Sequence, residues 1–288
     1  MQRFKSLILI IFVVFTAFKS DKPAYLLFDK DGKTTKYEKL LRQIEDADIV
    51  LFGELHDNPI SHWLELEVTK DMYEIAGNNL ILGAEMFETD NQLILTEYVD
   101  SLILTSRFED EAKLWPNYKT DYKPLVEFAR TNKLTFVATN VPRRYASLVN
   151  AKGLEALEEL PEEAKAYLPP LPIAYDPTLN CYKSMLEMEG MGSHVNENFP
   201  KAQAIKDATM ANSILKHWEP GKKLLHYHGA YHSQNFESIY WYLKQYKPEL
   251  RIVTIHCVTQ NDISELEKDN TGLADFTICI DEDMTRTR

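Results

Sequence analysis

Residues 48–59 read DIVLFGELHDNP, and this stretch contains the structural unit on which the fold is built. After Asp48, its next four residues form an apolar run without alternation, which favours a strand buried on both faces. Asn58 and Pro59 are typical of an N-cap followed by proline at the first helical position. The helical spacing then continues in four apolar residues, Leu64, Val68, Met72 and Ile75. The stretch therefore predicts a strand, a polar loop and a helix in succession.

Similar apolar runs recur along the chain, each bounded by polar segments. They cover residues 80–84, 134–138, 223–226, 251–255 and 276–280. Helical patterns separate several of these runs, and one of them follows Ser233, a predicted N-cap. Strands that alternate with helices predict an α/β fold with a mainly parallel sheet flanked by helices.

Two stretches interrupt this alternation. Residues 88–132 are helical in pattern, and residues 144–200 combine an acidic helix near 153–167 with a proline-rich run and a Met-rich segment. We expect 144–200 to be a helical subdomain inserted into an α/β domain that spans residues 21–288.

The first 20 residues have the features of a secretory signal peptide. Arg3 and Lys5 precede an apolar run from Leu7 to Phe18, which is too short to span a bilayer comfortably. We therefore predict export to the periplasm or cell envelope, with an uncleaved N-terminal anchor as the alternative. No cysteine precedes Cys181, so a lipoprotein anchor is not expected.

The composition excludes several classes of protein. The chain has 288 residues, 44% of them hydrophobic, which is incompatible with disorder. Its net charge of −12 argues against nucleic acid as a partner, because binding a polyanion needs a concentrated basic face. The three cysteines lack metal-type spacing and allow at most one disulfide, and we expect Cys257 and Cys279, which lie in apolar runs, to be buried thiols.

Polar residues with ligand or acid–base chemistry follow four of the predicted strands. They occupy residues 53–57, 85–88, 139–143 and 226–232. In an open parallel sheet, ligands bind outside the carboxyl ends of the strands, so these loops should converge on one cleft. Within the last loop, alternation places His226 and His228 on one face.

Four of these residues have the chemistry of a metal-dependent hydrolase: Glu54, His56, Glu85 and His232. A divalent cation held by His56, Glu85 and His232 would activate water, and the other carboxylate would act as general base. A capping role for Glu54 or His56 and a solvated position for Glu85 remain alternatives. His62, one helical turn further on, is expected at the surface.

Gln203, Asp207 and Met210 stand at i, i+4 and i+7 of a predicted helix and so share one face. The alternatives for this face are a contact surface and a solvated polar stripe.

Six sequence blocks occur in a recognisable order between about residues 48 and 235. They are Gly53-Glu-Leu-His56; Leu82-Gly-Ala-Glu85-Met86-Phe87 with Gln92; Trp115-Pro with Tyr122-Lys-Pro124; Asn140-Val-Pro-Arg143; Gln203-Ala-Ile-Lys-Asp207-Ala-Thr-Met210-Ala211; and Gly229-Ala-Tyr-His232. Together they resemble the ChaN-type haem-binding proteins of bacteria. The wider superfamily includes Tiki-type metal-dependent proteases and erythromycin esterases.

The resemblance implies an exported protein that binds haem, takes part in haem and iron uptake with other envelope components, and forms a homodimer around the cofactor. It also implies a tyrosine as iron ligand, since a phenolate stabilises ferric iron. Tyr122 is the first candidate and Tyr118 the second, with aromatic packing as the alternative for both. The matching blocks imply further cofactor contacts from Asn140, Arg143, Gln203, Asp207 and Met210.

Family members often carry a lipoprotein cysteine near the N-terminus, which is not expected here, and the chain departs from the family pattern in two further places. Ser61-His62 with Glu65 stands where paired histidines and a glutamine are usual, and Lys206 replaces an arginine. Lysine keeps the charge but loses the bidentate fork. A cleft that binds some other small anionic ligand is a third reading of the same residues.

Overall fold

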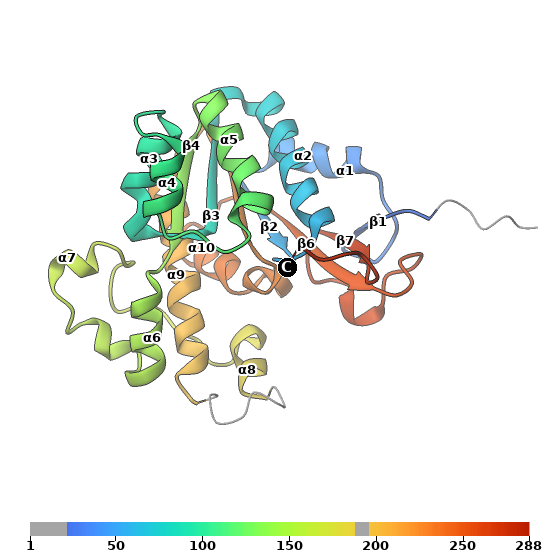
Figure 1. Cartoon of the computed structure of the whole chain (residues 1–288). Helices are drawn as coiled ribbons and strands as arrows, with labels where there is room; N and C mark the ends of the chain where they lie inside the picture. The colour runs from blue at the N-terminus through green and yellow to red at the C-terminus, as the bar shows by residue number, and fades with distance from the viewer. Residues whose placement is uncertain (1–21, 188–195, 288) are drawn as a thin grey trace, which may run out of the picture.

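A seven-stranded sheet forms the centre of the computed structural model, which describes residues 22–187 and 196–287 (Figure 1). The strands are β1 (Tyr25–Asp29), β2 (Ile49–Glu54), β3 (Leu80–Glu88), β4 (Thr135–Asn140), β5 (Lys223–Gly229), β6 (Ile252–Gln260) and β7 (Phe276–Asp281). Their order is β1-β7-β6-β2-β5-β3-β4, and only the β1–β7 pair is antiparallel. The predicted α/β fold with a mainly parallel sheet is confirmed. The expected signal peptide, residues 1–20, lies outside the described residues.

Helices cover the sheet on both faces and meet it in two large apolar clusters. They are α1 (Tyr37–Asp46), α2 (Pro59–Ala76), α3 (Gln92–Val99), α4 (Thr105–Glu111), α5 (Lys123–Asn132), α6 (Arg143–Lys152), α7 (Glu162–Lys165), α8 (Asn180–Glu187), α9 (Phe199–His217) and α10 (Ile239–Tyr246). The first cluster contains the buried side chains of α1, α2, α3 and α5, and the second contains those of α6, α8, α9 and α10. No helix within the described ranges is both long and apolar enough to cross a bilayer.

The strand–loop–helix unit predicted from residues 48–59 is present. All six residues of β2 are buried, and β2 lies between β5 and β6. The Asn58 side chain accepts hydrogen bonds from the backbone N–H groups of Ile60 and Ser61, and Pro59 opens α2. This cap fixes the direction in which α2 leaves the end of β2.

Gly53 is required by close packing within β2. A Cβ atom at this position would lie 2.9 Å from Ala230 Cα and 3.1 Å from the carbonyl oxygen of Ile255. Both neighbours are backbone atoms, which cannot rotate away as a side chain can. The central strand therefore has no room for a side chain at the residue before Glu54.

The prediction that Ser233 caps a helix is wrong. Ser233 precedes a short 3₁₀ turn, Gln234–Phe236, and α10 begins only at Ile239. Asn235, Phe236 and Ser238 all have positive φ angles, which a continuous right-handed helix does not allow.

The described part of residues 144–200 contains α6, α7 and α8, but residues 166–179 form no helix, and the acidic helix predicted near 153–167 is divided into a 3₁₀ turn at Leu154–Leu157 and the short α7. Side chains of α6 and α8 join those of α9 in the second apolar cluster. Residues 188–195, which include part of the Met-rich segment, lie outside the described residues.

All three cysteines are buried and free, as predicted for Cys257 and Cys279. Each belongs to a different apolar cluster: Cys257 to the first, Cys181 to the second, and Cys279 to a small third cluster with Phe28, Val258 and Ile263.

Candidate functional site

A cavity of about 500 Å³ opens at the carboxyl ends of the central strands. Its lining includes His56 after β2, Glu85 of β3, Asn140 at the end of β4, and Arg143 at the start of α6. Three of the four polar loops predicted to converge therefore contribute directly to its wall. The fourth reaches it through His232, whose Nε2 lies 3.2 Å from Glu85 Oε1. The volume is within the usual range for small-molecule sites.

His56 projects from the loop after β2 and is held by a buried carboxylate. Its Nδ1 lies 2.5 Å from Glu54 Oε1, and its side chain is 34% exposed, whereas that of Glu54 is 0% exposed. Asn117 donates a hydrogen bond of 2.8 Å to the His56 carbonyl oxygen, and Trp115 packs edge-on against the ring. The bond to Glu54 leaves Nε2 as the ring nitrogen without a hydrogen-bond partner among the described residues. His56 therefore offers the cavity an oriented imidazole nitrogen.

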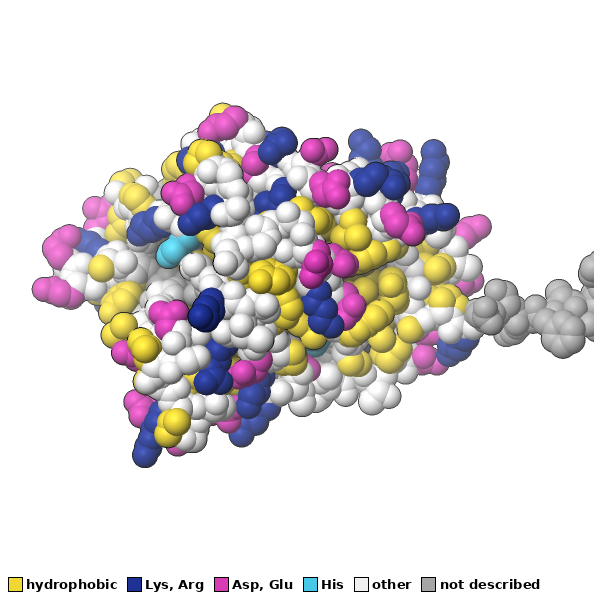
Figure 2. All heavy atoms as spheres, turned by 90° about the horizontal axis from the view of Figure 1, so that it is seen from above, with side chains coloured by type: hydrophobic (Ala, Val, Ile, Leu, Met, Phe, Trp, Pro, Cys, Tyr) yellow, Lys and Arg dark blue, Asp and Glu magenta, His cyan; other side chains and the backbone are white. Residues whose placement is uncertain are grey.

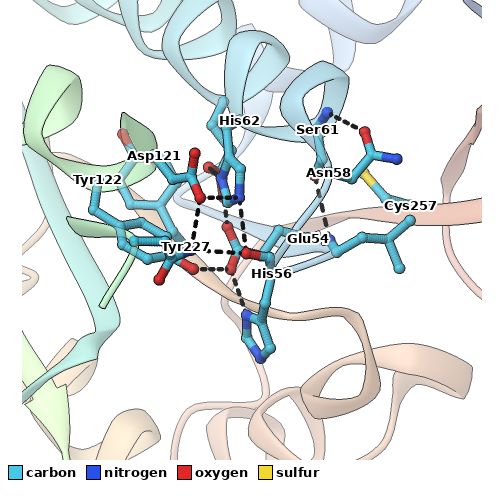
Figure 3. A network of polar contacts seen from close by, with 12 residues as sticks. Glu54, His56, Asn58, Ser61, His62, Asp121, Tyr122, Tyr227 and Cys257 are labelled. Atoms are coloured by element: carbon cyan, nitrogen blue, oxygen red, sulfur yellow. Dashed lines mark hydrogen bonds and ion pairs between the residues drawn. The ribbon is translucent and has the colours of Figure 1, made fainter. Parts of the chain in front are cut away.

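Glu54 is also bonded from its other side. The Tyr122 hydroxyl donates to Glu54 Oε1 at 2.7 Å, and Figure 3 shows both this bond and the one from His56 reaching the carboxylate. Burial alone would raise the pKa of Glu54, but the hydrogen bond from His56 and the nearby charge of His62 lower it below its usual range. Glu54 is therefore ionised and anchors several donors at once.

A second carboxylate–imidazole group lies at the cavity wall. His232 Nδ1 lies 2.5 Å from Asp207 Oδ1, while Nε2 faces Glu85. Burial opposes a charge on this ring, but the two carboxylates raise the pKa of His232 to about 10. The backbone N–H of Gly229 donates to Glu85 Oε2 at 2.8 Å. His232 is thus an imidazolium with both nitrogens engaged.

Metal binding by His56, Glu85 and His232 stays a prediction. His232 bonds carboxylates through both ring nitrogens, so a cation bound there would have to displace one of these contacts. Among the described residues, the group whose ligand atoms all lie within 4.8 Å of one another is a different one, Glu54, His62 and Glu65.

Two of the three residues on the predicted face of α9, Gln203 and Asp207, contact His232 in this site. Asp207 bonds His232, and the Gln203 amide nitrogen lies 3.1 Å from His232 Nδ1, so the face is a contact surface and not a solvated stripe. The Tyr182 hydroxyl donates to the other oxygen of Asp207 at 2.9 Å. Met210 is fully buried in the second apolar cluster and is not among the cavity-lining residues.

The structure places Tyr118 and Tyr122 in the core. Each is 2% exposed, both lie in a π-helical turn before α5, and neither lines the cavity. Burial raises the pKa of both hydroxyls above the ordinary value, which disfavours the phenolate. In this structure both tyrosines pack in the core, which was the alternative to iron ligation.

The expectation that His62 lies at the surface is wrong. His62 is 6% exposed, and its Nδ1 lies 3.1 Å from Glu54 Oε2 and 3.0 Å from Glu65 Oε2. Sequence reasoning gave Glu65 no role in the site. Its position three residues before Val68 and four before Thr69, on the buried side of α2, is the signal that could have identified it.

His226 and His228 share a face, as alternation predicted, but that face is in the interior. Both are fully buried, their rings stack at 5.1 Å, and His226 Nε2 lies 2.7 Å from the Thr139 hydroxyl. Burial lowers the pKa of both, that of His228 to about 3, so both are neutral.

Comparison with known proteins identifies the family to which the chain belongs. The family described as "Haem-binding uptake, Tiki superfamily, ChaN" matches residues 40–243. The Arabidopsis thaliana protein RETICULATA-RELATED 5, chloroplastic, is 31% identical over 200 residues, which are 65% of this chain and 26% of that protein. The chain thus spans about a quarter of that relative's length.

Two solved structures have a similar fold. The structure described as cofacial haem binding to ChaN of Campylobacter jejuni has a TM-score of 0.63 and 17% identity, over 88% of this chain and 96% of that one. A Bacillus cereus protein has a TM-score of 0.50 and 13% identity, over 85% and 90% of the two chains. Because the family match covers well over half of the sequence, the chain belongs to the ChaN family of haem-binding uptake proteins in the Tiki superfamily.

Proposed function

We propose that the protein binds haem in the cavity beside His56. The observation that carries this proposal is the oriented imidazole nitrogen of His56 at the wall of a partly apolar cavity. Haem is a flat apolar macrocycle with a central iron and two carboxylate groups. The apolar part of the lining suits the macrocycle and consists of Trp115, Val141, Ala146, Phe199 and Ala202.

Two basic side chains suit the carboxylate groups of haem. Arg143 and Lys206 both line the cavity, Arg143 from α6 and Lys206 from α9. The face shown in Figure 2 has acidic and basic side chains interspersed. Because the chain as a whole carries a net charge of −12, attraction of an anionic ligand depends on these local bases and not on a broad positive field.

His56 fits the role of iron ligand better than the tyrosines do. Ligating histidines usually donate their other ring N–H to a carboxylate, which fixes the tautomer and raises the basicity of the ligand nitrogen. Glu54 is placed to accept that bond. Tyr122, the ligand implied by the family resemblance, would have to leave the core and break its bond to Glu54.

We further propose an exported homodimer that serves haem and iron uptake at the cell envelope. The Campylobacter relative is described as binding haem cofacially, an arrangement that brings two haem faces together. The cavity is open on one side, so a second copy with its own haem could cover the face that one chain leaves exposed. The apolar run in residues 7–18 supports export.

Haem titration tests this function directly. Purified protein should give a saturable shift of the Soret band, and the double variant Arg143→Glu/Lys206→Glu should bind at least about tenfold more weakly. Lys36→Glu/Lys268→Glu changes the charge equally at exposed residues that do not line the cavity, and should bind like the wild type. No saturable shift at micromolar haem would contradict the proposal.

A second candidate function is hydrolysis, and one observation favours it. Two carboxylate–imidazole groups, Glu54–His56 and Glu85–His232, lie at the same cavity. Gly229 lies close to both: its N–H bonds Glu85, and a Cβ atom at this position would be only 2.8 Å from His56 Nε2. His56 has the arrangement of a general base backed by Glu54, and the His232 imidazolium that of a general acid.

A panel of ester and peptide substrates tests the hydrolase function. Any hydrolysis should fall by at least about a hundredfold in His232→Gln, because the general acid is lost. The same variant should still bind haem if the cavity lining is intact. Equal rates in the wild type and the variant would remove the hydrolase assignment.

A further inference from the structure

A buried group of ligand-type side chains lies between β2 and α2, beneath the cavity. Its members are Glu54, His62 and Glu65, which are 1%, 6% and 0% exposed. Figure 3 shows His62 and Glu54 pointing toward one another. The haem proposal uses only one oxygen of Glu54, the one that bonds His56. The remaining atoms of the group have no part in that function.

Two carboxylate oxygens of this group lack a hydrogen-bond donor. Glu54 Oε2 and Glu65 Oε1 are buried without a hydrogen-bond partner among the described residues. A buried polar atom left unsatisfied costs about 1–3 kcal/mol, and more when the group is charged. Oxygens of this kind, on two different elements and next to an imidazole, are those that a cation would satisfy.

The orientation of each side chain is fixed by contacts outside the group. His62 Nε2–H donates to the His56 carbonyl oxygen at 3.2 Å, and Nδ1 faces the two carboxylates. Burial lowers the pKa of His62, but the two carboxylates raise it to about 11, so a bound cation would take the place of the proton on Nδ1. Tyr122 and His56 hold the other oxygen of Glu54. Metal-binding side chains are typically oriented by such outer hydrogen bonds.

We propose that Glu54, His62 and Glu65 form a binding site for a divalent transition-metal cation such as Zn²⁺. One imidazole nitrogen and two carboxylate oxygens are a suitable donor set for this class of ion, and the two carboxylates balance its charge. His62 Nδ1 stands 3.1 Å from Glu54 Oε2 and 3.0 Å from Glu65 Oε2. With metal–ligand bonds of about 2.0–2.2 Å, tetrahedral ligands stand roughly 3.4 Å apart, so small side-chain shifts complete the site.

The site is separate from the cavity but adjacent to it. Glu54 contacts both: Oε2 belongs to the metal group, and Oε1 bonds the imidazole that faces the cavity. A bound cation would fix the Glu54 carboxylate and, through it, the ring of His56.

Metal titration of the full chain tests the proposal. After removal of metal with a chelator, calorimetric titration with Zn²⁺ should show one equivalent bound per chain, and Glu65→Gln should weaken binding at least about a hundredfold. Glu67→Gln, on the same helix but paired with Lys70, should bind Zn²⁺ like the wild type. Co²⁺ provides a second measurement, since its visible absorption when bound to the wild type should be lost in Glu65→Gln.

Several outcomes would overturn the site. They are no stoichiometric Zn²⁺ or Co²⁺ in the wild type, or equal affinities in the wild type and Glu65→Gln. If Glu65→Gln does not fold, His62→Asn removes the nitrogen ligand and should give the same loss. Haem titration of Glu65→Gln separates the two proposals, because the cavity lining is unchanged in this variant and its haem affinity should be retained.

Discussion

Replacing His56 with alanine should weaken haem binding by at least about a hundredfold and abolish the Soret shift at micromolar haem. The reason is that His56 is the cavity-lining imidazole, and Glu54 holds it with Nε2 free for iron. Axial ligation of iron depends on such a donor, and truncation to alanine leaves none in its place. The measurement is absorbance during haem titration, supported by thermal melting to show that the variant is folded.

Two further variants sharpen the result. His217→Ala removes an exposed histidine at the end of α9 and should bind haem like the wild type. Tyr122→Phe removes only the hydroxyl that bonds Glu54, and it should retain the Soret shift. The opposite pattern, with loss in Tyr122→Phe and binding in His56→Ala, would assign the iron to the tyrosine.

Gly53→Ala should destabilise the fold by about 3 kcal/mol, a value typical of severe overpacking in a core. The added Cβ would stand 2.9 Å from Ala230 Cα and 3.1 Å from the Ile255 carbonyl oxygen. Relief requires β2 to move away from its neighbours, which breaks ladder hydrogen bonds at the centre of the sheet. The melting temperature should fall by roughly 6–12 °C.

Gly83→Ala provides the comparison for this prediction. Gly83 lies in β3, and its added Cβ would meet side-chain atoms of His226 and Thr139, each at 3.2 Å. Side chains can adjust where backbone cannot, so this variant should lose less stability than Gly53→Ala. Equal losses in urea unfolding of the two variants would show that contact with backbone is not the decisive factor.

Much of the fold could be predicted from the sequence because the six parallel strands are continuous apolar runs. Strand β1 was missed because it is a five-residue edge strand with mixed burial, and its antiparallel pairing to β7 leaves no local signature. The start of α2 was predicted because Asn58 and Pro59 act locally. The start of α10 was not predicted, since it depends on positive φ angles at non-glycine residues, which the sequence does not indicate.

The candidate site likewise has a part that the sequence predicts and a part that it does not. Convergence of Glu54, His56 and Glu85 follows from the geometry of parallel strands, which any sequence of this pattern shares. Helical spacing places Glu65 on the buried side of α2, but the burial of His62 was not predicted, because charged side chains enter a core only with partners. Their partner here is Glu54, which comes from another element of the fold.

The separation of the three thiols determines how the fold responds to its redox surroundings. Because Cys181, Cys257 and Cys279 are buried in different apolar clusters, a disulfide between any two would require the core to be dismantled. The folded state therefore contains no bond that a reductant could break or an oxidase must form. Its folding therefore requires no disulfide exchange, whatever the redox state of its surroundings.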